Sequence, residues 1–168
     1  MTRRIESLSR FRDLRNERSV FASEHELAGN HALAYLARWS VLEDFARRLG
    51  PICQRVQLEM CVLQWQQYLQ SGQQLKPPKP IPARAFELAD DQTATIPQEA
   101  LLQMVLPLQE APVLYKLLAT GQKYRNRRNK IAHFGEGVSE FVYTEFKRHV
   151  ESALEEIDRW LKCSTLFS

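Results

Sequence analysis

The chain has 168 residues, of which 44% are hydrophobic and 26% charged, with a formal net charge of +3 and a pI near 8.8. This length suits one domain with its own core, and the composition excludes a chain that is mainly disordered. The net charge is too small to identify a nucleic-acid binder, so such a function would have to depend on local clusters of cations.

Signals for targeting, disulfides and cofactors are absent from the sequence. No apolar run approaches the roughly 18 residues that a transmembrane helix needs, and the residues after Met1 lack a hydrophobic signal core. We therefore expect a cytoplasmic protein that does not enter the membrane. Three cysteines without a Cys-x-x-Cys pair argue against a disulfide scaffold and a zinc site, so we predict buried thiols, no metal and no cofactor.

The first part of the chain is predicted to form an arm and two helices. Residues 1–22 are rich in arginine and lack a clear apolar stripe, which favours an N-terminal arm or a peripheral helix. Ser23 and Glu26 have the spacing of a capping box, and apolar residues recur at helical spacing from there to Gly50. A second helical pattern follows Pro51, and the junction is compatible with a tight turn or a kink. The two helices are expected to pack antiparallel.

The second part of the chain is predicted to contain a loop and three further helices. The prolines of residues 73–96 impose extended conformations, which indicates a long surface loop. A short helix is expected at about 97–106. Another helix begins at Pro112 and ends at Gly135, and a final amphipathic helix starts near Ser139.

These elements predict an all-α fold, a bundle of four to five helices with a long proline-containing loop, because no strand pattern or internal repeat is visible. The arm 1–22 would precede one helical domain, 23–168. The loop 73–96 is interpreted as an insertion into this domain.

Segment 123–130 holds five cations in eight residues, a density far above that of the whole chain. They are Lys123, Arg125, Arg127, Arg128 and Lys130. The segment is a candidate for binding anions. The alternative is a solvated helix end, since cations near a helix C-terminus are stabilised by about 0.3–1 kcal/mol each.

The order of residues after this cluster favours a specific function. Arg128, Asn129 and His133 resemble the Arg-x4–6-His motif of the HEPN superfamily of helical nucleases and nucleotide-binding domains, in which a polar residue often follows the arginine. The spacing alone is weak, because Arg18 and His25 also satisfy it. The context adds to the resemblance, since the motif lies near the end of an amphipathic helix and precedes a glycine-bearing loop and a long last helix.

The segment 39–45, Trp-Ser-Val-Leu-Glu-Asp-Phe, is similar to the acidic-aromatic segment of the same family, so the resemblance spans roughly residues 25–162. Glu43 and Asp44 in this segment are candidates for supporting the site, although adjacent acids on a helix are more often solvated. One subgroup of the family carries a tyrosine two residues after the histidine. This chain has Gly135 there, which argues against that subgroup.

Cleavage of RNA without a metal requires the residue types of this motif. A base deprotonates the ribose 2′-hydroxyl, an acid protonates the departing 5′-oxygen, and a cation stabilises the extra negative charge on phosphorus. Imidazole groups titrate near neutral pH, and arginine donates two parallel hydrogen bonds to phosphate oxygens. We therefore predict His133 as acid or base, Arg128 as the phosphate clamp and Asn129 as a positioning residue.

Helical geometry separates two of these residues. On a straight helix Asn129 and His133 share a face, whereas Arg128 points about 140° away from His133 at roughly 3.6 residues per turn. Either the helix distorts near the motif, or a second subunit completes the site. HEPN ribonucleases are dimeric at this site, so the resemblance implies a homodimer through the motif helix.

The leading hypothesis is a metal-independent endoribonuclease that leaves 2′,3′-cyclic phosphate and 5′-hydroxyl ends. The remaining cations, Lys123, Arg125, Arg127 and Lys130, would attract the RNA backbone. The resemblance implies a toxin or an anti-phage defence effector, with a neutralising or regulatory protein partner. The alternatives are a non-catalytic HEPN-like module that binds RNA, a nucleotide or a protein, and a helical adaptor without a ligand.

Overall fold

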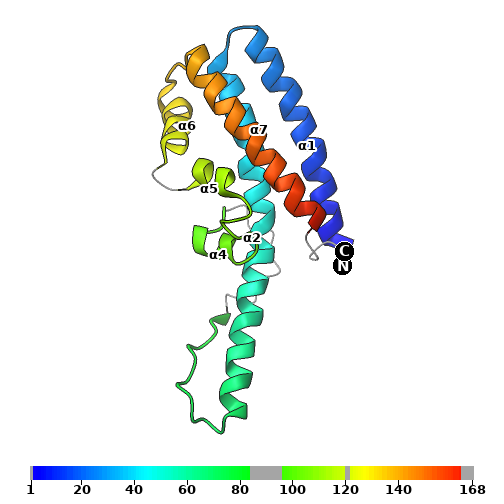
Figure 1. The fold of residues 1–168 in the computed structure, drawn as a ribbon, viewed down its shortest axis with the longest axis vertical. Coiled ribbons are helices and arrows are strands. Elements are labelled where there is room, and N and C mark those ends of the chain that lie inside the picture. Colours follow the sequence, from blue (N-terminus) through cyan, green and yellow to red (C-terminus); the bar gives the residue numbers. More distant parts are fainter. Residues whose placement is uncertain (1, 84–95, 120–121, 164–168) are drawn as a thin grey trace. The chain divides into compact units, whose positions relative to one another are not determined.

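The computed structural model describes residues 2–83, 96–119 and 122–163, and every regular element within these ranges is an α-helix. The helices are α1 (Thr2–Leu27), α2 (His31–Gln70), α4 (Glu99–Gln103), α5 (Pro112–Leu118), α6 (Lys123–Phe134) and α7 (Glu140–Cys163) (Figure 1). The predicted all-α fold is thus confirmed.

The chain divides into two compact units. The bundle unit comprises Met1–Phe45 and Leu108–Ser168, and the second unit comprises Ala46–Pro107. The bundle unit therefore contains α1, the first part of α2, α5, α6 and α7. All the residues predicted to form the functional site belong to this unit.

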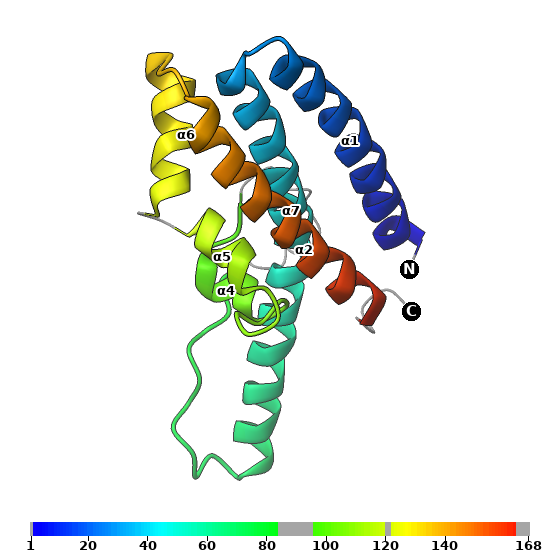
Figure 2. The same cartoon turned by 45° about the horizontal axis from the view of Figure 1, so that its top comes forward.

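Aromatic side chains form the core of the bundle unit, where α1, the first part of α2 and α7 lie side by side (Figures 1 and 2). Tyr35 of α2 stacks on Phe146 of α7, with ring centroids 3.6 Å apart. Phe45 packs against Phe11 of α1 at 5.4 Å and edge-on against Trp160 of α7 at 6.0 Å. All five side chains are buried. Each stabilises the fold by roughly 2–3 kcal/mol through removal of apolar surface from water.

A polar network joins α1, α2 and α7. The buried Arg38 donates from Nε to the Tyr143 hydroxyl at 2.8 Å, and Lys147 donates to the Glu26 carboxylate at the same distance. Partial burial raises the pKa of Glu26, but hydrogen bonds from Lys147 and Tyr143 and the nearby positive charges outweigh it. The pKa of Glu26 therefore lies below its usual value of 4.5, and the carboxylate stays ionised at neutral pH.

The start of α2 differs from the predicted one. Ser23 lies inside α1, where its hydroxyl donates to the Ser19 carbonyl. The chain turns instead at Gly29, which has a left-handed φ of 74°, and Asn30 caps α2 by accepting a hydrogen bond from the Leu33 N–H at 3.3 Å. The predicted capping box is wrong because this glycine turn and asparagine cap determine where the helix begins.

α2 continues through Pro51, so the predicted pair of antiparallel helices is wrong at this junction. A proline inside a helix removes one backbone hydrogen bond and costs roughly 3 kcal/mol. The neighbouring Leu49 and Cys53 side chains are fully buried, and their removal from water offsets part of this cost. Burial also raises the pKa of the Cys53 thiol to about 12.

The other two cysteines differ from the predicted buried thiols. Cys61 is half-buried and Cys163 is exposed. The prediction is therefore correct only for Cys53.

In the second unit, residues 71–82 form turns and extended chain, as expected for the start of the predicted loop. The Trp65 indole of α2 donates to the Lys79 carbonyl at 3.2 Å, which ties the extended chain to the helix. The rest of the predicted loop includes 84–95, which lies outside the described residues. The predicted helix 97–106 is shorter than expected, because only α4 and a following turn form there.

The helix predicted from Pro112 to Gly135 is divided into α5 and α6. α5 does begin at Pro112, and the buried Glu156 carboxylate of α7 accepts hydrogen bonds from the N–H groups of Val113 and Leu114 at 2.9–3.1 Å. A carboxylate at this position satisfies backbone donors that have no partner within the helix. Glu156, distant in sequence, therefore determines how α5 begins.

α6 ends at Gly135, as predicted. Gly135 has a φ of 63°, its N–H donates to the Ile131 carbonyl at 3.0 Å, and the Glu136 N–H reaches the Lys130 carbonyl at 3.5 Å. This Schellman-type arrangement satisfies carbonyls of the last helical turn and directs the chain back past the helix end. α7 then begins directly after Ser139, also as predicted.

Substitution Gly135→Ala is expected to lower the free energy of unfolding by about 1–2 kcal/mol, because a Cβ disfavours the left-handed conformation. Gly137→Ala is the matched control, since Gly137 lacks a positive φ and an added Cβ would meet nothing within 4 Å. The control should change stability by less than about 0.5 kcal/mol. Urea unfolding measures both, and equal stabilities of the two variants would contradict the assigned role of Gly135.

Candidate functional site

The cationic helix α6 is anchored by its first turn. Tyr124 and Ile131 are its buried side chains. The Tyr35 hydroxyl donates to the Tyr124 carbonyl at 2.9 Å, and the Tyr124 hydroxyl donates to the Glu145 carboxylate at 3.0 Å. Burial, this hydrogen bond and the charge of Glu145 raise the pKa of Tyr124 to about 12, so the phenol remains a donor at neutral pH.

The first two predicted RNA-binding residues have partners within the protein. Lys123 lies 3.1 Å from Glu145 of α7, and Arg125 donates to the Leu118 carbonyl at 2.8 Å. Hydrogen bonds from Lys123 and Tyr124 keep the pKa of Glu145 below 4.5. The phosphates of a bound RNA would have to compete with these protein groups for Lys123 and Arg125.

Arg128, the predicted phosphate clamp, is oriented by α2. Its Nη2 atom lies 2.9 Å from one Glu43 oxygen and 3.1 Å from the other, and its Nη1 donates to the Asn129 side chain at 3.1 Å. The Glu43 side chain is 14% exposed and that of Arg128 is 26% exposed. The structure thus brings the candidate supporting residue Glu43 to the motif, while its neighbour Asp44 is half-buried.

Two cations of the site, Arg127 and Lys130, converge on one carboxylate. Arg127 forms an ion pair with Glu136, and Lys130 Nζ lies 3.9 Å from the other Glu136 oxygen. The site residues predicted from sequence did not include Glu136. The available signal was that it is the one acidic residue in segment 122–139, directly after the glycine that ends α6.

His133 is exposed in the last turn of α6, with its ring edge-on to the exposed Phe134 ring at a centroid distance of 6.4 Å. α6 is uninterrupted from Lys123 to Phe134, so the helix does not unwind at the motif. Of the two explanations for the separation of Arg128 and His133, helix distortion is not observed. Completion of the site by a second copy stays a prediction.

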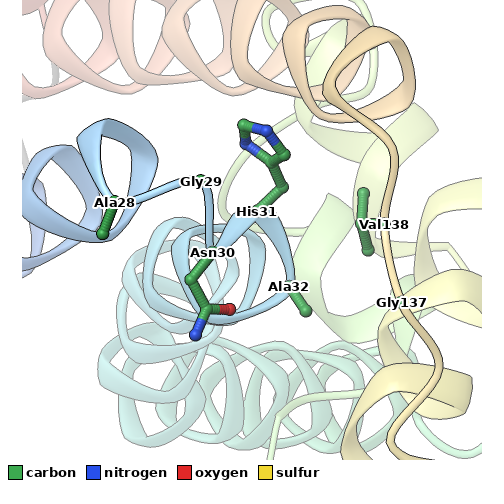
Figure 3. A pocket seen from close by; sticks show the side chains of 7 residues that line it. All are labelled: Ala28, Gly29, Asn30, His31, Ala32, Gly137 and Val138. Atoms are coloured by element: carbon green, nitrogen blue, oxygen red, sulfur yellow. The ribbon is translucent and has the colours of Figure 1, made fainter.

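An open hollow of about 370 Å³ lies beside the connection between α6 and α7. Residues 28–32 line one side, and Gly137 and Val138 line the other (Figure 3). The His31 ring stacks on Tyr143 at 5.3 Å, and within the described residues its buried Nδ1 atom has no hydrogen-bond partner. The lining contains no carboxylate, lysine or arginine. The hollow is therefore not a charged site, and its polar side chains are those of Asn30 and His31.

Among the described residues, no three His, Cys, Asp or Glu side chains gather closely enough to hold a metal ion. Each helix within the described residues is too short or too polar to cross a membrane. No protein-family model, curated protein or solved structure matches the chain. The function is therefore inferred from the residues of this chain.

A double-mutant cycle with Glu43→Gln and Arg128→Gln should show a coupling of about 1 kcal/mol in the free energy of unfolding, because the pair is partly buried and hydrogen-bonded. The more exposed pair of Lys123 and Glu145, replaced by glutamines in the same way, should couple less. Urea unfolding of the seven proteins, wild type included, provides both values. Additive effects at Glu43 and Arg128 would show that the ion pair does not hold α6.

Proposed function

We propose that the chain is a HEPN-type, metal-independent endoribonuclease that leaves 2′,3′-cyclic phosphate and 5′-hydroxyl ends. The supporting observation is that the neighbouring α2 carboxylate, Glu43, orients Arg128, which in turn contacts Asn129. His133 lies exposed at the end of the same cationic helix. A clamp held in place and an accessible imidazole are what this chemistry requires.

In the proposed reaction, a histidine takes the proton of the ribose 2′-hydroxyl, and the 2′-oxygen attacks the adjacent phosphorus. The bond from phosphorus to the 5′-oxygen breaks, and an acid gives that oxygen a proton. The guanidinium of Arg128 balances the additional negative charge on the phosphoryl oxygens in the transition state. Asn129 orients the guanidinium through the contact between their side chains.

One copy of His133 can act as base or acid in a given step, but the reaction needs both. We propose that a homodimer through α6 supplies two copies, one for each proton transfer. The resemblance to HEPN nucleases further supports a cytoplasmic toxin or anti-phage effector that a protein partner neutralises.

The alternative is a non-catalytic HEPN-like module that binds RNA, a nucleotide or a protein. One observation favours it: Glu43 already neutralises Arg128, and Glu136 already pairs with Arg127 and Lys130. A phosphate must therefore compete with carboxylates of the protein. Binding without turnover would follow if Arg128 keeps Glu43 as its main partner.

The decisive measurement incubates wild type and His133→Ala with mixed tRNA and mRNA in EDTA, followed by chemical identification of the ends. Wild type should produce cyclic phosphate and 5′-hydroxyl ends, and His133→Ala should be slower by about 10²- to 10⁴-fold, the usual contribution of a general acid or base. His25→Ala is the matched control, because Arg18 and His25 have motif spacing but no comparable context.

Equal cleavage by wild type and His133→Ala would contradict the proposed catalytic role and indicate a contaminant or another site. Salt-dependent RNA binding without cleavage would favour the non-catalytic module. If wild type neither binds nor cleaves RNA, the remaining interpretation is the helical adaptor without a ligand.

The Glu136 carboxylate is expected to compete with RNA phosphates for Arg127 and Lys130. Glu136→Gln should therefore tighten binding of a single-stranded RNA by about two- to fivefold, which corresponds to the range of an exposed ion pair. Glu151→Gln, an equal change of charge at an exposed position of α7, is the control. Fluorescence anisotropy at several salt concentrations measures both, and unchanged or weaker binding of Glu136→Gln would argue against an RNA site at these cations.

A further inference from the structure

Two phenylalanines flank the connection between α6 and α7 with almost completely exposed rings. Phe134, the last residue of α6, is 83% exposed, and Phe141, in the first turn of α7, is 80% exposed. The core side of α7 is formed by residues such as Tyr143 and Phe146, and Phe141 lies off that side. Neither ring contributes to the packing of the bundle unit, so fold stability does not explain them.

The place of these rings relates them to the candidate site. Phe134 directly follows His133, and the two rings meet edge-on at 6.4 Å. Phe141 lies at the other end of the five-residue connection that carries Glu136. A polymer whose phosphate reached His133 would therefore have its next groups close to Phe134.

Charge indicates which partner suits the two rings. Segment 122–139 contains five cations and one acidic residue, and several of these cations keep partly exposed side chains. An apolar protein surface would displace water from these cations and offer no negative charge in exchange. A single-stranded nucleic acid matches both features, because its phosphates pair with cations while its bases stack on aromatic rings.

We infer that Phe134 and Phe141 form a stacking platform for the RNA bases that flank the phosphate at His133. This inference rests on the proposed function and specifies its substrate class. Bases that stack on the protein must be unpaired, so the substrate is single-stranded RNA or the unpaired loop of a folded RNA. Because every base has a flat π face, the platform tolerates many sequences.

The test uses a single-stranded RNA with 2′-O-methyl riboses, which lacks the attacking hydroxyl and cannot be cleaved by the proposed reaction. It carries 2-aminopurine, whose fluorescence falls when the base stacks. Phe134→Leu and Phe141→Leu should each weaken binding by about fivefold or more and reduce the quenching, in the range measured for loss of one base stack. Phe134→Trp should retain both properties.

Phe21→Leu on α1 is the matched control, because its ring is 39% exposed and lies away from the cationic segment in sequence. It should leave affinity and quenching unchanged, and circular dichroism confirms that each variant remains helical. A duplex RNA of the same sequence should bind wild type and both leucine variants equally.

Unchanged affinity and quenching in both leucine variants would overturn the platform, and cleavage by wild type would show that the proposed function survives. Loss of self-association in these variants, with RNA affinity unchanged, would assign the rings to an interface between copies and also overturn the inference. Wild type that neither binds nor cleaves RNA would overturn the platform together with the proposed function.

Discussion

The ion pair between Arg128 and Glu43 holds the candidate site to the bundle unit. α6 carries five cations and no acidic residue, so a helix of this composition gains little from packing by itself. Its buried Tyr124 and Ile131 supply limited apolar contact. Ion pairs with carboxylates on neighbouring segments also hold the helix in place. These carboxylates are Glu43 of α2, Glu145 of α7 and Glu136 of the connection between α6 and α7. The residue best suited to clamp a phosphate is therefore also one that positions its helix.

Two of these carboxylates differ in exposure, and this difference bears on the proposed function. Glu43 is 14% exposed, and its removal would leave the partly buried Arg128 with the neutral Asn129 side chain but without this carboxylate. Glu136 is 35% exposed and projects from a connecting segment, so solvent and a phosphate can replace its contacts with Arg127 and Lys130 at little cost. The arrangement combines one cation held in a fixed orientation with two whose partner is exchangeable, as expected of a surface that binds a polyanion.

The polar network around Glu26 holds the start of α7, which follows the connection from α6. Tyr143 belongs to this network through its hydroxyl, which contacts Arg38 and Glu26, and its ring stacks on His31 beside the hollow. These contacts fix the first turns of α7 and therefore the position from which Phe141 projects. The exposed rings and the exposed His133 thus flank a connection whose two ends are both held by the bundle unit.

Local signals in the sequence determined much of this protein. Helical periodicity, Pro112, Gly135 and Ser139 predicted the all-α fold, the start of α5, the end of α6 and the start of α7, because these signals lie at the helix ends that they mark. The cluster of cations and the motif were also visible in the sequence. Local signals failed at Ser23, where a hydroxyl that fits a cap lies inside a helix, and between α5 and α6, where a single helix was predicted. They left the junction at Pro51 compatible with a turn or a kink.

Only the tertiary structure decided which partners these residues have. Arg128 and Glu43 are 85 positions apart, and the Glu156 carboxylate that begins α5 lies 42 and 43 positions from the amides it binds. Charge patterns identify candidate partners, but which pairs form depends on how the helices pack around the aromatic core. The sequence therefore determined the helices and their chemical character, whereas packing determined which carboxylate meets each cation and which aromatic rings remain exposed.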